Sequence, residues 1–196
     1  RFRGEEERTP VDICTAVEEA LNFMRATLPA TIEIRRDIRL ERALTLADPT
    51  QIHQILINLC TNAAHAMEEN GGSLEIRIDD VELPSPAWSG FGDVRPGPYI
   101  QITINDTGRG MDADIVAKIF DPYFTTKPVG KGSGLGLAVV HGIVKRHAGA
   151  ISVRSQPGEG SSFRIILPKA QESLESTCET EAALPRGDER VLFLDD

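Results

Sequence analysis

Two carboxamide side chains, Asn58 and Asn62, lie four residues apart in an apolar helix that the sequence predicts over residues 49–69. A helix turns by about 100° per residue, so both amides fall on one narrow stripe. Three further polar residues complete that stripe: Gln51, Gln54 and His65. A solvated polar face is the ordinary explanation, but apolar residues cover the rest of the helix, so we expect the stripe to face a cavity. Carboxamide oxygens at positions i and i+4 could bind a hard cation such as Mg²⁺, with water and phosphate oxygens as its other ligands.

A carboxylate, Asp106, continues the apolar face of the strand predicted over residues 98–106. Such a group is costly on an apolar face unless it finds hydrogen-bond donors. One interpretation is an aspartate that caps the turn into Thr107 and Gly108. The other is a pocket residue that accepts hydrogen bonds from the exocyclic amine of an adenine. In that case Gly108 and Gly110 would let the backbone pass close to the ring.

Glycines at positions 130, 132, 134 and 136 lead into a helix that the sequence predicts from about Ser133 to His147. A glycine-rich run at the start of a helix presents unpaired N–H groups at the positive end of the helix dipole, which is a phosphate site. A flexible hinge explains one glycine more easily than four. The run is not a P-loop, because neither Lys127 nor Lys131 is followed by Ser or Thr, and no strand precedes it as in a dinucleotide-binding fold. Lys127, Lys131 and Ser133 are candidates for direct phosphate contact.

Three aromatic residues at positions i, i+3 and i+4 lie in the segment between these features: Phe120, Tyr123 and Phe124. We expect them to anchor a mobile segment to the body of the protein. An ordinary role in the core is the alternative, and it is compatible with the same segment closing over a bound nucleotide as a lid.

The elements that must position these residues mix helices and strands. Besides the two helices named above, we expect helices over 13–28, after the N-cap Asp12, and over 112–119. The predicted strands are residues 31–38, 42–48, 73–83, 98–106, 149–155 and 161–167, with a long hairpin loop at 84–97. This order predicts an α+β fold, a two-layer sandwich in which a mixed, mostly antiparallel sheet carries helices on one face.

Composition limits the class of protein. The chain has 196 residues, a net charge of −9 and a pI near 5.0, which argues against a nucleic-acid partner. No stretch approaches the roughly 18 consecutive apolar residues of a membrane helix, and the N-terminus has no signal-peptide pattern. The three cysteines are widely spaced and outside any CxxC, so neither disulfides nor zinc are indicated. We therefore expect a soluble, reduced, cytoplasmic protein.

Four segments together resemble the N, G1, F and G2 boxes of sensor histidine kinases. They are NLCTNA (58–63), DTGRGM (106–111), IFDPYFTTK (119–127) and GSGLGL (132–137), and they are followed by GEGSSFRIILP (158–168). Each box alone is weak, but their order and spacing match the catalytic ATP-binding domain of that family over roughly residues 9–168. The residues of the last two boxes and of the helix that follows resemble the nitrogen-regulator-like branch of these kinases in particular. The family has the left-handed ATP-binding fold of type II topoisomerases, mismatch-repair ATPases and heat-shock chaperones.

The resemblance implies a set of site residues. Asn58 and Asn62 would be the catalytic residues that bind Mg²⁺ and the phosphates of ATP, and Asp106 would recognise adenine. His65 stands where the family often has a phosphate-contacting lysine or arginine, and Ala66 stands where it sometimes has an aromatic residue over the base. The other implied ATP-binding residues are Gly108, Gly110, Met111, Lys127, Lys131, Gly132, Ser133, Gly134, Leu135 and Gly136.

One position discriminates among the relatives. The ATP-hydrolysing members carry a glutamate general base where this chain has Asn58, and an amide cannot take a proton from water. The resemblance therefore implies a phosphotransferase with weak ATP hydrolysis. The family also needs a phospho-accepting histidine on a helix, followed by an acidic residue. None of the four histidines is followed by an acidic residue, and all four lie in helices predicted for the catalytic domain itself. The acceptor histidine is therefore expected on a separate domain.

The resemblance also suggests how the chain is divided. We expect residues 1–8 to lead from an upstream dimerisation and histidine-phosphotransfer domain and residues 9–168 to form the catalytic domain. An acidic linker would follow at 169–189, and the start of a truncated receiver domain, with Mg²⁺-binding acids, at 190–196; an unstructured tail is the alternative there. The parent protein would be a homodimeric hybrid kinase. Two other functions stay open: a nucleotide-binding module without transfer activity, and a mechanochemical ATPase, which Asn58 disfavours.

Overall fold

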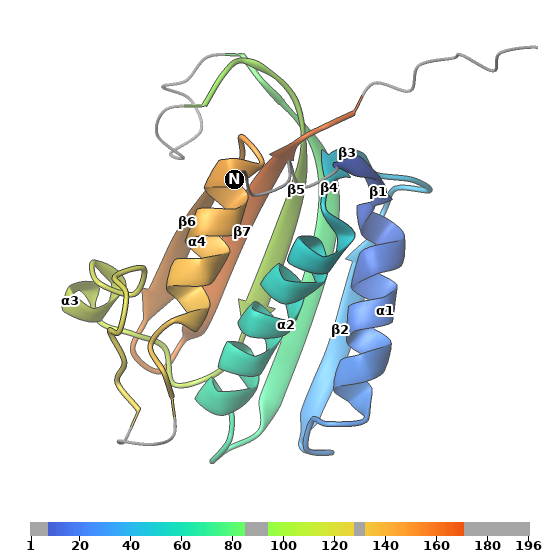
Figure 1. Ribbon diagram of the computed structural model, residues 1–196. Helices are drawn as coiled ribbons and strands as arrows, with labels where there is room; N and C mark the ends of the chain where they lie inside the picture. The colour runs from blue at the N-terminus through green and yellow to red at the C-terminus, as the bar shows by residue number, and fades with distance from the viewer. Residues whose placement is uncertain (1–7, 85–93, 128–131, 171–196) are drawn as a thin grey trace, which may run out of the picture.

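The computed structural model describes residues 8–84, 94–127 and 132–170 (Figure 1). The strands are β1 (Thr9–Asp12), β2 (Ile32–Ile38), β3 (Leu44–Ala47), β4 (Gly72–Leu83), β5 (Gly97–Asp106), β6 (Ala150–Gln156) and β7 (Gly160–Pro168). The helices are α1 (Ile13–Arg25), α2 (Pro49–Ala66), α3 (Ala113–Val116) and α4 (Gly136–Arg146). The expected start of a receiver domain, at 190–196, lies outside the described residues.

One five-stranded sheet carries the fold, with the order β2-β4-β5-β7-β6. The pair β2–β4 is parallel and the other three pairs are antiparallel. Helices α1, α2 and α4 lie side by side over one face of this sheet (Figure 1). The predicted two-layer α+β sandwich with a mixed, mostly antiparallel sheet is therefore confirmed. A separate two-stranded ribbon pairs β1 with β3, and β1 escaped prediction because four residues are too few to show an alternating pattern.

The helix starts follow local side-chain chemistry. Asp12 and Asp48 are the N-caps of α1 and α2, and their carboxylates accept hydrogen bonds from the backbone N–H groups of Cys14 and Thr50. Such a cap satisfies a donor that the first turn of a helix leaves unpaired. The predicted helices are longer than the observed ones: α3 is only one turn, and α4 begins at Gly136 because glycines are poor helix formers.

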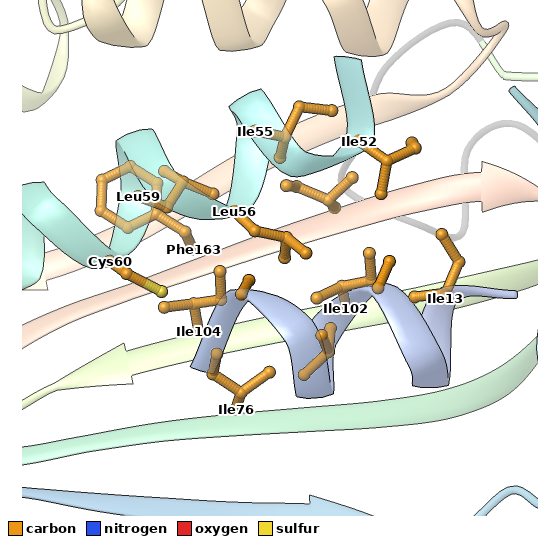
Figure 2. Packing of buried hydrophobic residues seen from close by; sticks show 14 of the residues in the cluster. Ile13, Ile52, Ile55, Leu56, Leu59, Cys60, Ile76, Ile102, Ile104 and Phe163 are labelled. Atoms are coloured by element: carbon orange, nitrogen blue, oxygen red, sulfur yellow. The ribbon is translucent and has the colours of Figure 1, made fainter. Parts of the chain in front are cut away.

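The main core lies between the sheet and its helices. Figure 2 shows isoleucines of β4 and β5, such as Ile76, Ile102 and Ile104, facing Leu56 and Leu59 of α2. Alternate residues of a strand point to the same face, so the alternating pattern of β4 and β5 supplies this surface. Burial of one such side chain contributes about 2 kcal/mol. These contacts hold α2, and with it the stripe of amides, against the sheet.

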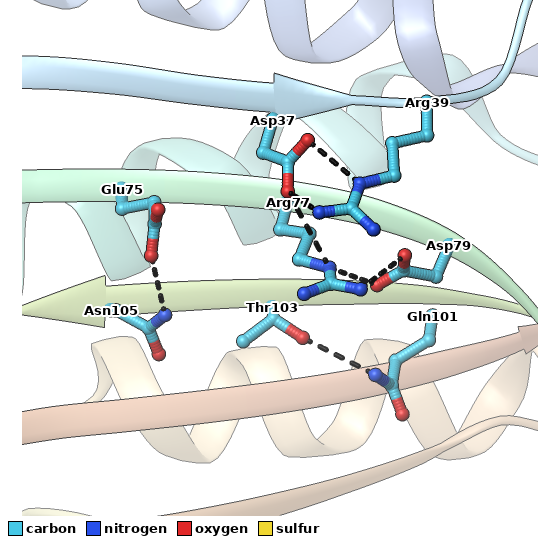
Figure 3. A network of polar contacts seen from close by, with 8 residues as sticks. All are labelled: Asp37, Arg39, Glu75, Arg77, Asp79, Gln101, Thr103 and Asn105. Carbon is cyan, nitrogen blue, oxygen red and sulfur yellow. Dashed lines mark hydrogen bonds and ion pairs between the residues drawn. The ribbon is translucent and has the colours of Figure 1, made fainter.

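The opposite face of the sheet is polar. It carries ion pairs between Asp37 and Arg39 and between Arg77 and Asp79, and a hydrogen bond from Asn105 to Glu75 (Figure 3). Partly exposed pairs of this kind contribute about 0–1 kcal/mol each. The sheet therefore needs no second layer of helices there, and the fold stays at two layers.

Candidate functional site

A cavity of about 500 Å³ opens between α2, the end of β5, the segment that follows it and the start of α4. The predicted site residues that line it are Asn58, Asn62, His65, Asp106, Gly110, Met111, Lys127, Gly132, Ser133, Gly134 and Gly136. These residues come from four separate parts of the sequence. The fold therefore brings most of the predicted site together in one place.

Two predicted site residues that the structure describes, Gly108 and Leu135, are not part of this lining. Lys131 lies outside the described residues. Gly108 is buried against the end of α2 instead: a Cβ atom on it would lie 2.6 Å from the Cβ atom of Ala66. Leu135 precedes α4 with its side chain exposed. Gly108 thus permits a close approach of two backbones, and that approach positions the cavity wall without forming it.

The polar stripe of α2 reaches the cavity only along its second half. Asn58, Asn62 and His65 line the cavity, whereas Gln54 is exposed. Gln51 is buried in the first turn, where its amide donates a hydrogen bond to the Asp48 carboxylate (3.2 Å). The helix spans about 27 Å at 1.5 Å per residue, and only its second half contributes lining residues. The prediction that the stripe faces a cavity is correct for its last three members.

Asp106 is almost completely buried, with 6% of its surface exposed. Its Oδ1 accepts a hydrogen bond from the backbone N–H of Gly108 (2.9 Å), so the turn-capping interpretation is confirmed. Burial raises the pKa of this carboxyl, and hydrogen bonds from Gly108 and Ser161 partly offset that rise. The same side chain lies on the cavity wall. The recognition of adenine remains a prediction, and it is compatible with the capping role.

The floor behind Asp106 is formed by backbone packed on backbone. Gly110 has a φ of +66°, and a Cβ atom there would lie 1.8 Å from the carbonyl oxygen of Gln156. Gly160 has a φ of +87°, and its Cβ atom would lie 1.9 Å from the carbonyl oxygen of Asp106. Only glycine accepts this geometry. The turn between β6 and β7 therefore presses directly on the segment 106–111.

Hydrogen-bond donors gather where α2 faces Lys127. The Lys127 Nζ lies 3.5 Å from Asn62 Oδ1 and 3.2 Å from His65 Nδ1. Since His65 Nδ1 is also 2.7 Å from the carbonyl oxygen of Thr61, that nitrogen carries the hydrogen and donates it. The Lys127–His65 contact thus joins two donors. Burial, and then the charge of Arg109, lower the pKa of Lys127, and an anionic ligand would relieve both effects.

The glycine run brings the start of α4 against α2. A Cβ atom on Gly136 would lie 3.6 Å from Asn58 Oδ1, so the first turn of α4 borders the Asn58 amide. No side chain caps this helix start, and its first N–H groups suit phosphate oxygens. Gly134, with a φ of +67°, accepts a hydrogen bond from the Tyr123 N–H on its carbonyl oxygen (3.0 Å). The glycine run and the aromatic segment are therefore tied together.

The aromatic anchors are only partly as predicted. Phe120 and Phe124 pack against the core, and Phe124 also lines the cavity. Tyr123 is 76% exposed and has a left-handed backbone, with a φ of +67°. The prediction that Tyr123 is an anchor is wrong, because its backbone conformation turns the ring away from the core.

Sequence reasoning missed several lining residues. Arg109 is the one with a charge, and its position between two glycines of the segment 106–111 was the available signal. Others are apolar or hydroxyl side chains whose place depends on the tertiary structure: Ala63, Ile115, Ile119, Thr125, Thr126, Leu137, Ser161 and Phe163. Across residues 8–84, 94–127 and 132–170, no group of three or more His, Cys, Asp or Glu could hold a metal ion. A magnesium ion at Asn58 and Asn62 would therefore need phosphate oxygens as ligands.

The sequence and the fold of the chain match known proteins. Residues 47–171 match the family described as histidine kinase-, DNA gyrase B-, and HSP90-like ATPase. Sensor kinase CckA of Brucella abortus (strain 2308) is 40% identical over 159 residues, which are 81% of this chain and 17% of that protein. Among solved structures, the catalytic domain of histidine kinase ThkA aligns with a TM-score of 0.68 at 25% identity, over 83% of this chain and 96% of that one.

A second solved structure, full-length ShkA in complex with AMPPNP, aligns with a TM-score of 0.68 at 26% identity. The alignment covers 86% of this chain but 32% of that one. The chain thus spans about a sixth of the length of CckA and a third of ShkA. Within the described part of the chain, no helix is long and apolar enough to cross a membrane.

Proposed function

Because the chain belongs to the histidine kinase-, DNA gyrase B-, and HSP90-like ATPase family, we propose that it is the ATP-binding catalytic domain of a two-component sensor histidine kinase. It binds Mg·ATP and transfers the γ-phosphoryl group to a histidine on a separate domain. The matches to sensor kinases support this choice within the family. The bound ATP analogue named for ShkA supports the choice of nucleotide.

The proposal rests on the presence of a buried acceptor and of a cationic group at different parts of the cavity wall. A buried carboxylate, Asp106, offers an acceptor on one part of the wall. Another part holds Lys127 beside Asn62 and His65, with Arg109 near enough to lower the pKa of Lys127. A nucleotide matches both, since its base carries an amine donor and its phosphates carry negative charge.

The proposed reaction is catalysed by positioning and charge neutralisation. The bond between the γ-phosphorus and the β,γ-bridging oxygen breaks, a phosphorus–nitrogen bond forms at the acceptor imidazole, ADP leaves with the bond's electron pair, and the imidazole releases its N–H proton to water. Asn58 and Asn62 would hold Mg²⁺ and the phosphates, and the start of α4 would cover them. Asn58 cannot serve as a general base, so water is not activated and hydrolysis stays weak.

The histidines of this chain do not suit the acceptor role. His147 is 4% exposed, His65 donates to the helix backbone while it lines the cavity, and His53, which lies 2.9 Å from Glu19, is followed by Gln54 and not by an acidic residue. His141 faces the ring of Phe120 at 5.3 Å. We therefore propose that the acceptor lies on a dimerisation domain upstream of residue 9. We also propose that residues 169–189 are an acidic linker and that a receiver domain follows them. We further propose that the parent protein is a homodimer, that ATP binds with Mg²⁺, and that this domain lies in the cytoplasm.

Calorimetric titration with ATP, with and without Mg²⁺, tests the binding site. We expect Mg²⁺-dependent binding, and a loss of at least about tenfold in affinity in Asp106→Asn and in Asn62→Ala. Matched controls are Asp79→Asn, on the polar face of the sheet, and Asn22→Ala, on the exposed side of α1. If both site variants bound ATP as the controls do, the site assignment would be wrong.

Phosphotransfer in trans tests the activity. The chain alone, incubated with ATP labelled at the γ-phosphate, should form no phosphohistidine and release phosphate slowly. Addition of a matching dimerisation and histidine-phosphotransfer domain should yield label on that domain. Label on the isolated chain would contradict the separate acceptor. ATP binding without transfer to any supplied histidine domain would favour a nucleotide-binding module that lacks kinase activity.

A further inference from the structure

His147 is a buried histidine that the proposed reaction does not use. It follows α4 as its C-cap residue and is 4% exposed. Its Nδ1 lies 2.9 Å from the carbonyl oxygen of Ile143 in the last turn of α4. Its Nε2 lies 3.3 Å from the backbone nitrogen of Asp48, the N-cap residue of α2. The ring therefore bridges the end of one helix and the beginning of the other.

These two contacts determine the state of the ring. A carbonyl oxygen only accepts, so Nδ1 carries a hydrogen and donates it to Ile143. The Asp48 amide only donates, so Nε2 carries no hydrogen and accepts. The imidazole is thus neutral, with its hydrogen on Nδ1, and both of its nitrogens are satisfied. Protonation would place an N–H group at Nε2 against the Asp48 N–H and remove the link to α2.

The helices joined by this ring are the two that border the phosphate end of the proposed site. Asn58 lies ten residues after Asp48 in the sequence, and Gly136 starts α4 eleven residues before His147. At 1.5 Å per residue, the ring is about 15 Å along each helix from the point where Gly136 meets Asn58. A small change of the angle between the two helices at His147 would therefore shift Asn58 relative to the first turn of α4.

We infer that His147 is a positioning residue for the nucleotide site: its neutral ring sets the placement of α4 relative to α2, and thereby the gap between Asn58 and the first turn of α4. The inference rests on the proposed function, since it concerns how that site is aligned for ATP. His147 is not among the residues that line the cavity, and its two hydrogen bonds join α4 to α2, so it acts through the helices.

Within the described part of the chain, charged residues lie next to both contacts of the ring. The Asp48 carboxylate, at the start of α2, is held by the N–H of Thr50 and the amide of Gln51. Lys145 and Arg146 belong to the last turn of α4. Arg8, from the segment before β1, donates to the carbonyl oxygen of Arg146 (2.5 Å). These charged groups are unchanged in the variants below, so each variant is compared with wild type at matched pH values.

Two substitutions separate alignment from stability. His147→Leu removes both hydrogen bonds while it keeps an apolar body, and His147→Gln keeps a neutral donor and acceptor that do not titrate. His53→Gln, on the first half of α2, is the control. Affinity for Mg·ATP is measured by calorimetry at about pH 8 and about pH 6, which bracket the range in which histidines titrate. The melting temperature and the imidazole nitrogen chemical shifts of each folded variant are recorded alongside.

We expect His147→Leu to lower ATP affinity about tenfold at the higher pH. Wild type and His53→Gln should lose more affinity on acidification than His147→Gln, because a protonated imidazole at position 147 exchanges its acceptor for a donor and glutamine does not. A lower melting temperature of His147→Leu with unchanged ATP affinity would overturn the inference, as would equal pH profiles for wild type and His147→Gln. If wild type failed to bind ATP, the proposed function would fail, and the nitrogen shifts would still decide whether the Nδ1–H ring joins the helices.

Discussion

Burial acts in opposite directions on the pKa values of two ionisable side chains that line the cavity. It raises the pKa of Asp106 and lowers the pKa of Lys127, because in each case the charged form loses hydration. In both residues it is the largest cause of the shift. A ligand that donates a hydrogen bond to the carboxylate and brings negative charge to the ammonium would compensate both. The two side chains are therefore poised for a ligand with an amine and an anionic group.

The shift at Asp106 predicts a pH dependence of stability. A carboxyl whose pKa is raised by folding stabilises the folded state below its unfolded pKa, near 3.8, and loses that contribution as the pH rises through the folded value. The unfolding free energy of wild type, relative to Asp106→Asn, should therefore be larger at about pH 4 than at about pH 7. Urea denaturation of both proteins measures it. A difference that grows with pH would contradict the assigned direction.

Arg109 should contribute to binding through the phosphates. It lines the cavity, and its charge lowers the pKa of Lys127. We expect Arg109→Gln to weaken ATP binding about fivefold, at the level of a partly exposed charge pair, while adenosine binding stays unchanged. Arg25→Gln, in the last turn of α1, is the control. Equal losses for ATP and adenosine would place Arg109 near the base instead.

At the scale of elements, loops with left-handed glycines join the strands and helices that carry the site. Gly110 is the sharpest case, since a Cβ atom there would lie 1.8 Å from the Gln156 carbonyl oxygen. Gly110→Ala should destabilise the fold by more than about 2 kcal/mol and abolish nucleotide binding. Gly142→Ala, in the exposed middle of α4 where a Cβ atom meets nothing within 4 Å, should stabilise it by about 0.5–1 kcal/mol. Chemical denaturation of the two variants compares them.

The end of α4 offers a second test of backbone conformation. Gly149 N–H donates to Val144, and Ala148 N–H donates to Lys145, which is a Schellman turn with Ala148 at its left-handed position, at a φ of +55°. Ala148→Gly should raise the unfolding free energy by about 1 kcal/mol, because the left-handed region is unfavourable for an L side chain. Ala26→Gly, at the right-handed C-cap of α1, should not stabilise. A destabilised Ala148→Gly would show that the left-handed turn is not populated in solution.

For the whole molecule, the cavity is bordered by α2, the segment after β5, the segment before α4 and β7. A ligand in it contacts several elements at once and should stabilise them together. At a hundred times its dissociation constant, a ligand adds about 2.7 kcal/mol to the unfolding free energy. Mg·ATP should therefore raise the melting temperature by about 5–10 °C. Calorimetry measures this shift, and a comparable shift in Asp106→Asn would contradict the site.

Local patterns in the sequence determined the elements and the residue types of the site. The N-caps Asp12 and Asp48 and the alternation of β4 and β5 are short-range signals, and the observed elements follow them. Asn58 and Asn62 share a helix face because of their spacing alone. The glycine run marks the start of α4 within three residues, since it interrupts helix formation locally.

Only the tertiary structure decided which of these residues meet. Gln51 shares the stripe of Asn58 and Asn62 yet lies buried at the first turn of α2, because the neighbours of a helix change along its length. Gly108 belongs to the same sequence box as Gly110, but it packs on Ala66 while Gly110 lines the cavity. His147 reaches Asp48 across 99 residues. Such contacts depend on sheet order and helix placement, which arise from the burial of the whole core and leave no periodic signal in the sequence.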